Sequence, residues 1–595
     1  MPIARANTWR SAASPCPASN RVRSPRVAGL VGAFLAMPLA AQTGTPTREE
    51  VNRAAPPLRS TAPARLTVDD ETAPPPCPLT DAAALTLRDA RFEHLQGLPE
   101  QALRPAFESY VGKRVSGADL CTIRDAATAI LARAGYVAAI RIPAQDGGGG
   151  IVRFDVVMAR LVRIELAGRS PRAAHRLAAY LAKLRAEPVF NVRTAERYLL
   201  LARDLPGYDI HLTLRSAGSA PGEVVGIVSI ARTPLAMGAN LQNYGSHELG
   251  RWGALVSAQV NDVAGLGDRL TLGLFNSLQV HEQTVMQGGY DLRLGGEGAA
   301  LGTRFTYAWT HPRIDGDALT SRTLVAAVEA SYPLVRRQAA TVRVAGGVEA
   351  IDQRLRQAGT LATRDRLRAA FLRLDLEMAE QAQGDILSPS ASPRWRLSGT
   401  LEVRRGLGIL GASANCGSAP AYADCTTLPT LSRLQADPQA TLIRFSGYGE
   451  LHPLPRIAIV ASPRLQYAFA PLASYEQYSG GAYTIGRGYD PGAAIGDSGA
   501  GISLEAQYGT IAARRRGLAF QPFVFIDGAW VWNHETFPPE DDPLRLFSAG
   551  GGVRVAVADR ARIELTAATP LRTGPYQTHR GDTRVLLSLT TRLLP

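Results

Sequence analysis

The chain has 595 residues, of which 46% are hydrophobic and 20% charged, and its formal net charge is +13. This composition excludes a disordered protein, and the length allows several domains or one very large one. Arginine carries almost all of the positive charge, since Lys113 and Lys183 are the only lysines, and the arginines are spread along the chain. Such a distribution argues against a nucleic-acid-binding protein, which gathers its basic residues in a patch.

Residues 1–41 predict a secretory signal peptide. Several arginines precede the apolar run Val27–Ala40, and the small residue Ala41 follows it. The run is too short to span a bilayer as a helix, and no later stretch reaches 18 consecutive apolar residues. If the protein lies in a membrane, we therefore expect it to cross without helices.

Residues 42–76 are rich in proline, threonine and alanine, which predicts a linker. The stretch "PTREEVNRA", residues 46–54, indicates one short helix within it. This helix is a candidate plug for a pore.

Residues 78–231 have a mixed α and β pattern. "CTIRDAATAILARAGY" places apolar residues at helical spacing and ends at Gly135, and strand-like runs follow at Tyr136–Ile142 and Ile151–Met158. The same order of patterns then repeats from "RLVRIELAG" onward. We expect two α+β modules, at residues 77–158 and 159–232, each of the order strand, helix, helix, strand, strand.

From residue 236 to residue 595 the helical period gives way to two-residue alternation. In "WRLSGTLEVRR", Trp395, Leu397, Leu401 and Val403 share one face, while charged and polar residues occupy the other. A soluble β-sandwich or propeller can also alternate. Alternation over such a length, with a charged polar face, is more typical of an antiparallel transmembrane β-barrel of about 16 strands with an aqueous lumen.

The cysteines fit an exported protein. The sequence has five cysteines, and one of them, Cys16, lies in the predicted signal peptide. The other four could form two disulfides in an oxidising compartment. Cys416 and Cys425 flank a loop-like stretch that a local disulfide could close, so we expect a bond in a surface loop. Cys77 and Cys121 would form the other pair. No cysteine spacing suggests a metal site.

Together these features resemble the outer-membrane transporters of two-partner secretion, which export haemolysins and filamentous haemagglutinins and whose modules are called POTRA domains. The stretch "NYGSHELGRWGALVSAQVNDVAGLGDRLTL", residues 243–272, is similar to the family's motif at the start of the barrel. "LLLARDLPG" is similar to a motif of the second module, with Arg203 where asparagine is usual. The module residues that match family motifs are Cys77, Cys121, Gly135, Tyr136, Pro143, Gln145, Leu205, Pro206 and Gly207.

The stretch "GRGYDPGAAIGDSG", residues 486–499, resembles the family's sixth loop, which lies in the lumen. The resemblance implies that Arg487 pairs with Asp527 of "FIDGAW" and so holds the loop inside the pore. Ala529 stands where the family has glycine. The alternative is that Asp527 is an ordinary lumen-facing charge. The residues assigned to this latch are Arg487, Gly488, Tyr489, Asp497, Gly499, Phe525 and Asp527.

"GDSG" at Gly496–Gly499 also surrounds the nucleophilic serine of chymotrypsin-like proteases. That motif continues with glycine, whereas Ala500 follows here, and no histidine stands in a recognisable setting. The sequence therefore disfavours a hydrolase, and we expect no catalytic residue, no cofactor and no metal.

The resemblance implies export of a large, unfolded, β-rich passenger across the outer membrane of a Gram-negative bacterium, with the POTRA domains in the periplasm. An unfolded segment could add to a POTRA sheet edge as an extra strand; alternatively, the modules only brace the barrel. The expected partners are the passenger, outer-membrane lipid and the machinery that inserts the barrel, and not nucleic acid; we expect a monomer. The rival functions are a barrel-assembly factor of the same superfamily and a passive porin.

Overall fold

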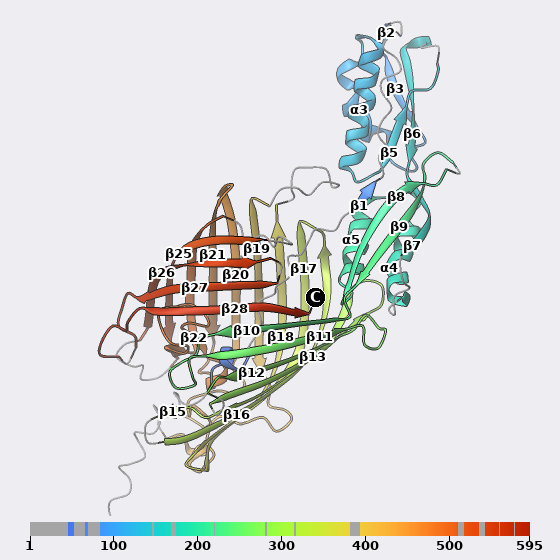
Figure 1. Ribbon diagram of the computed structural model, residues 1–595. Coiled ribbons are helices and arrows are strands. Elements are labelled where there is room, and N and C mark those ends of the chain that lie inside the picture. The colour runs from blue at the N-terminus through green and yellow to red at the C-terminus, as the bar shows by residue number, and fades with distance from the viewer. Residues whose placement is uncertain are drawn as a thin grey trace, which may run out of the picture.

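The computed structural model contains two small modules and a large barrel (Figure 1). It describes residues 46–52, 66–68, 84–145, 148–167, 174–218, 220–279, 282–314, 317–380, 393–419, 421–509, 517–534, 542–558, 560–575 and 577–594. The expected signal peptide and Cys77 lie outside the described residues.

The first module packs helix α3 against a three-stranded sheet of order β3-β6-β5. Ser116 is the N-cap of helix α3 and forms a capping box with Asp119, and the chain leaves the helix at Gly135 with a φ of +91°. The preceding helical segment, η2, is a 3-10 helix containing Pro105, which lacks the N–H that an α-helix would use. The elements are β2 (Leu85–Thr86), β3 (Asp89–Glu93), η2 (Glu100–Ala106), η3 (Glu108–Tyr110), β4 (Arg114–Val115), α3 (Gly117–Arg133), β5 (Ala138–Arg141), η4 (Gly148–Gly150) and β6 (Ile151–Met158).

The second module has the expected order of strand, two helices and two strands. Its elements are β7 (Arg160–Ala167), α4 (Ala174–Ala186), α5 (Val192–Arg203), β8 (Tyr208–Ser216) and β9 (Glu223–Arg232). A fourth strand, β1 (Leu66–Val68), pairs in parallel with β8, so the sheet has the order β1-β8-β9-β7. Part of the stretch read as a linker is thus a strand on the sheet edge.

The barrel closes where the last strand pairs with the first, β28 with β10. The barrel sheet contains seventeen strands in the described residues. One of them, β15 (Arg313–Ile314), pairs only with β16, while β14 pairs directly with β16, so sixteen strands form the wall. The first eight are β10 (Leu235–Gln242), β11 (Gly253–Asn261), β12 (Arg269–Ser277), β13 (Gln283–Leu294), β14 (Ala299–Thr310), β16 (Asp317–Arg336), β17 (Ala340–Gln357) and β18 (Thr360–Ala379). The others are β19 (Trp395–Gly406), β20 (Thr441–Leu454), β21 (Ile457–Ala468), β24 (Ser498–Tyr508), β25 (Leu518–Trp532), β26 (Leu544–Val557), β27 (Ala561–Pro570) and β28 (Arg584–Leu594).

Side chains alternate between the two faces of the wall, as the sequence predicts. On β18, Leu372 and Leu374 are exposed on the outside, whereas Arg373 between them is paired with Glu329 of β16. An apolar outer face and a charged inner face suit lipid outside and water inside. Among the described helices, none is long and apolar enough to span a membrane.

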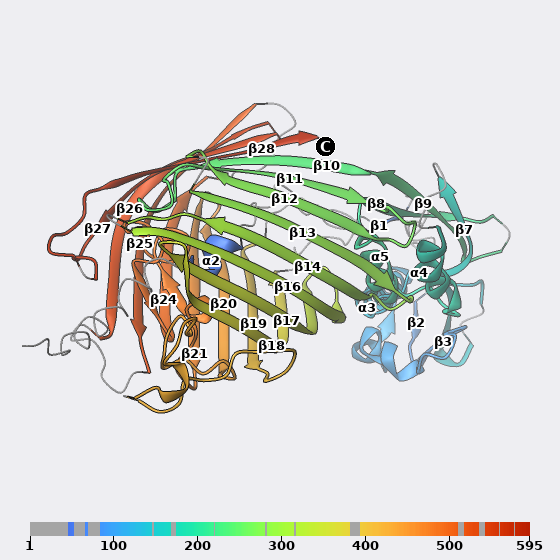
Figure 2. The ribbon, with the colours of Figure 1, turned by 90° about the horizontal axis from the view of Figure 1, so that it is seen from below.

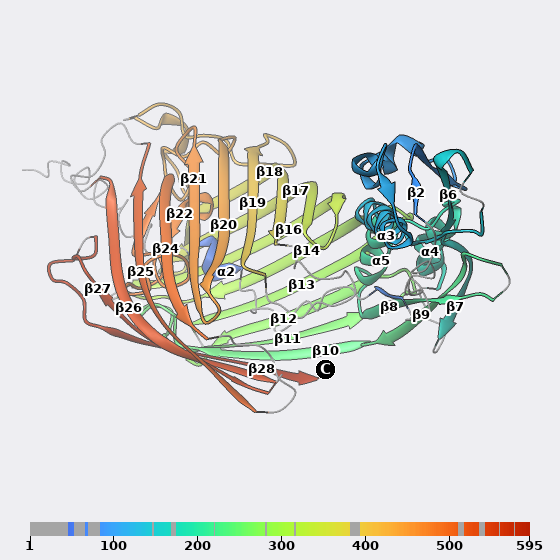
Figure 3. The ribbon, with the colours of Figure 1, turned by 90° about the horizontal axis from the view of Figure 1, so that it is seen from above.

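Strand direction divides the barrel into two ends. Strand β10 starts beside the second module, so the turns after β11, β13 and β16 return to the module end (Figures 1 and 3). The two longest connections between wall strands lie at the opposite end, which we call the far mouth. They are residues 407–440, the disulfide loop, with η5 (Ala423–Cys425), and residues 469–497, loop six, with η6 (Ser474–Glu476), β22 (Tyr478–Gly480) and β23 (Ala494–Gly496).

Candidate functional site: the barrel lumen

A short helix lies inside the barrel (Figure 2). This is α2 (Arg48–Val51), within the stretch where the sequence predicts a helix, and Thr47 and Glu50 close its first turn as a capping box. Glu49 is ion-paired with Arg464 of β21, and Val51 is completely buried. Further contacts include hydrogen bonds to the wall and to loop six, from Gln283 to the Glu50 carbonyl (3.2 Å), from Gln353 to the Pro46 carbonyl (3.3 Å) and from Asn52 to the Tyr475 hydroxyl (3.2 Å).

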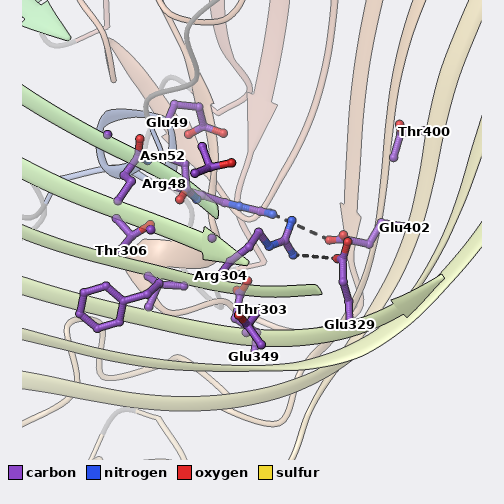
Figure 4. Close-up of a pocket in the computed structure, with 18 of the residues that line it drawn as sticks. Arg48, Glu49, Asn52, Thr303, Arg304, Thr306, Glu329, Glu349, Thr400 and Glu402 are labelled. Atoms are coloured by element: carbon purple, nitrogen blue, oxygen red, sulfur yellow. Dashed lines mark ion pairs between the residues drawn. The ribbon is translucent and has the colours of Figure 1, made fainter. Parts of the chain in front are cut away.

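Beside α2 the lumen holds a cavity of about 920 Å³ lined by residues of both charges (Figure 4). Arg304 is 3.1 Å from Glu329 across its wall, and Arg48 of the helix is 4.0 Å from Glu402. Glutamines and threonines complete much of the lining. A polar chain could therefore lie here without losing hydration or hydrogen bonds.

Arg487 and Asp527 are in contact, as the family resemblance implies. The guanidinium donates from Nε and Nη2 to the two carboxylate oxygens, at 3.1 and 2.9 Å, and the Arg487 backbone N–H donates to the same carboxylate at 3.0 Å. The Arg487 guanidinium carbon lies 3.4 Å from the centre of the Phe525 ring. Ala529 in place of glycine does not prevent this geometry. The loop is therefore held to β25 by a two-donor ion pair over an aromatic face.

Glu505 and Ser503 belong to the same cluster, and the sequence analysis missed both. Arg487 Nη1 is 3.0 Å from the Glu505 carboxylate, and Nη2 donates to the Ser503 hydroxyl at 2.8 Å. Glu505 is also paired with Arg554 of β26. In "ISLEAQY" the polar residues Ser503 and Glu505 alternate with apolar residues, so they share one face of β24. This alternation is the sequence signal that predicts both side chains to face the lumen.

Asp497, which the family resemblance assigns to the latch, has its contacts at another place in the far mouth. Its carboxylate is ion-paired with Arg433 of the disulfide loop and accepts backbone N–H groups from Leu472 (2.8 Å) and His534 (2.9 Å). It therefore joins three connections at the far mouth. Gly499 lies on β24, where a Cβ would be 2.5 Å from the Tyr478 ring, so glycine permits the loop to pack on the wall.

The tip of loop six packs against the last strands of the barrel. A Cβ on Gly488 would lie 2.8 Å from Ser548 and from the backbone of Pro570, which only glycine avoids. The Tyr489 hydroxyl is 2.9 Å from the carbonyl oxygens of both Phe547 and Arg572. These two motif residues fix the tip against β26 and β27.

The Cys416–Cys425 disulfide forms in a far-mouth loop whose residues around Cys425 are mostly exposed, in line with a surface loop, but one of its two cysteines faces inward. Cys416 is completely buried, in a cluster with Val51 of α2, Leu431 and Tyr475. Cys416 and Leu431 gain burial against the lumen contents, whereas Leu410 and Leu428 of the same loop are exposed. Thr430 forms a bridge with Thr363 of β18, beyond the residues that pair with β19, so this part of the loop extends the edge of the wall.

The remaining cysteine pair is described only in part. Cys121 on α3 is disulfide-bonded and buried. Cys77 lies outside the described residues, so the Cys77–Cys121 pairing remains a prediction.

In the first group of POTRA motif residues, Gly135 and Tyr136 lie at the joint between the two modules, whereas Pro143 and Gln145 lie within the first module. A Cβ on Gly135 would be 2.7 Å from Asn191, and Tyr136 forms a β-bridge with the same residue. Pro143 precedes Gln145, whose side-chain amide bonds both the N–H and the carbonyl of Arg153, at 2.8 and 2.9 Å. Gln145 thus replaces a missing strand partner beside β6.

The second group, Leu205, Pro206 and Gly207, lies where the second module meets the barrel. Leu205 is buried in the module core and approaches Gly267 in the turn after β11. Gly207 has a φ of +79°, and a Cβ there would lie 2.5 Å from Asn261. The motif thus allows close approach of the module to the barrel.

A closed barrel of sixteen strands that follows α+β modules, with its sixth far-mouth loop folded into the lumen, is the architecture of the outer-membrane proteins that combine POTRA-type modules with a barrel. Residues 223–555 match the model of the haemolysin secretion/activation protein ShlB/FhaC/HecB family, and residues 85–158 match the ShlB-type POTRA domain. The first match covers more than half of the chain, so the chain belongs to this family.

Solved structures share the fold. CdiB from Escherichia coli is 16% identical, with a TM-score of 0.66, over 93% of this chain and 95% of that one. CdiB from Acinetobacter baumannii is 15% identical, with a TM-score of 0.59, over 92% and 95%. BamA from Haemophilus ducreyi lacking POTRA domains 1–3 is 14% identical, with a TM-score of 0.50, over 86% and 100%. No curated protein sequence matches the chain.

Proposed function

We propose that this transporter exports an unfolded passenger protein through its lumen, without making or breaking a covalent bond. The observation that carries the proposal is the content of the lumen: a short helix held by polar contacts and by the burial of Val51, beside a polar cavity. A four-residue helix has little stability of its own and depends on those contacts. An arriving passenger can replace them one by one with its own polar groups.

The proposed orientation places both POTRA domains in the periplasm and the far mouth outside the cell. The longest connections between wall strands lie at the far mouth and the modules at the other end, as in outer-membrane barrels with short periplasmic turns. Protease added to intact cells should leave residues 84–232 uncut, while the same treatment of cells with a permeabilised outer membrane should cleave them. Cleavage of the modules in intact cells would reverse the orientation.

Passenger capture is assigned to the POTRA sheets. Their edge strands present backbone N–H and C=O groups that can pair with an extended segment of almost any sequence. In the second module β1 occupies the β8 edge, and β7 forms the other edge of the described sheet.

Export is tested by expressing the transporter with a candidate passenger, a large secreted β-rich protein from the same organism. The passenger should appear in the medium when the transporter is present and be retained or degraded in the periplasm when it is deleted. A normal amount of passenger in the medium of the deletion strain would contradict the proposal. If deletion instead lowers the amounts of other outer-membrane barrels, the protein is an assembly factor, and if it impairs only small-solute uptake, it is a porin.

A further inference from the structure

The seam between β10 and β28 is the shortest ladder among the described pairs of wall strands. Its pairing runs from Met237 to Gln242 on β10 and is interrupted by a register shift after Met237. By comparison, the ladder between β16 and β17 covers Leu319–Arg336. A short ladder has few backbone hydrogen bonds to break, so it opens more readily than its neighbours. The seam therefore has the fewest paired residues of the described joints in the wall.

Beyond Gln242 a side chain continues the seam toward the far mouth. The Asn243 carboxamide accepts the N–H of Leu587 at 2.7 Å and donates to the carbonyl of Val585 at 2.9 Å. The backbone N–H of Asn243 also donates to the Leu587 carbonyl, at 3.2 Å. The Asn243 side chain thus makes the hydrogen bonds to β28 that a backbone peptide group of β10 would make if the strand continued.

Loop six reaches the same end of the seam. The Asp490 carboxylate is 3.0 Å from Arg584, the first residue of β28, and 3.6 Å from Arg251, in the connection after β10. Arg584 also donates to the backbone carbonyl of Tyr489. The Arg584 side chain is only 11% exposed, whereas those of Asp490 and Arg251 are 34% and 50% exposed. One carboxylate therefore separates two guanidinium groups that would otherwise repel each other across the seam.

We propose that Asp490 is a positioning residue that staples the seam shut, so that loop six controls the closure of the barrel as well as the contents of its lumen. The Arg487 contacts hold the loop on β24 and β25, and Asp490 uses that fixed loop to join the last strand to the first. If the proposed export occurs, a passenger that displaces loop six also releases this end of the seam. The staple itself does not depend on the proposed function.

The test is hydrogen exchange measured by mass spectrometry on the full-length protein in lipid nanodiscs, without passenger. In Asp490→Asn the amides of residues 237–243 and 584–594 should exchange about threefold to tenfold faster than in the wild type, as expected for loss of a half-buried ion pair. Asp291→Asn is the matched control, because Asp291 pairs with Arg269 at 2.7 Å between β12 and β13 with comparable exposure. This control should leave the seam amides unchanged.

If Asp490→Asn accelerates exchange only within residues 481–493, Asp490 merely shapes loop six and the proposal is wrong. Arg584→Gln should reproduce the effect on the seam from the strand side. A cross-link between Leu241→Cys and Leu589→Cys, which are partners across the seam, should restore slow exchange to the Asp490→Asn barrel. Fast exchange that persists in the cross-linked variant would also overturn the proposal, since the strands could not have parted there.

Discussion

Arg433 of the disulfide loop and Asp497 of loop six form a buried ion pair that joins the two loops over the far mouth. Their side chains are 1% and 0% exposed. Arg433 also donates to the carbonyl of Leu472 at 2.6 Å. The disulfide loop also packs on Val51 of α2. The ion pair therefore links loop six, through the disulfide loop, to the helix in the lumen.

Arg433→Ala should open the far mouth. Removing one partner of a buried pair leaves an uncompensated charge, at a cost of about 3–5 kcal/mol. We expect the two loops to move apart so that water can solvate the Asp497 carboxylate. We expect higher single-channel conductance in planar bilayers, with the barrel still folded. Arg405→Ala, which changes an exposed arginine at the end of β19, is the control. Equal conductance in both variants would mean that the pair does not close the mouth.

Arg487→Ala should reduce passenger secretion about tenfold or more while the barrel still assembles. The variant removes the contacts to Asp527, Glu505 and Ser503 together, whereas Asp527→Ala leaves the last two in place and should be milder. Arg487→Lys should rescue only in part, since an ammonium cannot make the planar two-donor contact. The measurement is passenger in the medium, normalised to barrel in the membrane fraction.

Arg545→Ala is the control for the Arg487 series, because Arg545 is an exposed arginine on β26. If Arg487→Ala secretes the passenger normally, or if that barrel does not reach the membrane, the hypothesis that Arg487 acts as a latch in secretion is wrong.

Peptide mapping without reduction should recover Cys416–Cys425 and Cys77–Cys121. The first bond closes a loop of sequence separation 9, for which chain entropy predicts roughly 2–3 kcal/mol of stabilisation. Because Cys416 is buried, the native barrel should resist a mild reductant and lose this bond only on unfolding. A Cys77–Cys425 peptide would refute both pairings.

The alternation of Leu372, Arg373 and Leu374 predicted the barrel because lipid and water impose a two-residue period that one strand displays by itself. The Arg487–Asp527 pair could be predicted only through resemblance, since it joins a loop to a strand 40 residues away. Arg433, Asp490 and Arg584 carry no local signal of their partners. Their roles follow from loops that fold back over the lumen, and the inward fold of Cys416 escaped prediction for the same reason.

Asp204, which directly precedes the Leu-Pro-Gly motif, is one of the residues that join the second module to the barrel. Its carboxylate accepts two hydrogen bonds from Arg336 of β16, at 2.9 and 2.8 Å, and its carbonyl accepts one from Arg293 of β13 at 3.1 Å. The Asp204 and Arg336 side chains are 22% and 18% exposed. Two charge-assisted bonds in this partly buried setting are worth about 1.5–3 kcal/mol.

Asp204→Ala should therefore loosen the module without unfolding it. We expect faster hydrogen exchange in the barrel turns at residues 262–268 and 295–298, and less secreted passenger, because the module is no longer held in a fixed orientation to the barrel. Arg336→Ala should give the same result, and the double variant should be little worse than either single one, because the residues act as a pair. Asp209→Ala is the control, since Asp209 pairs with Arg203 and His211 within the module. Additive effects of Asp204→Ala and Arg336→Ala, or an equal loss in Asp209→Ala, would show that this ion pair does not orient the domain.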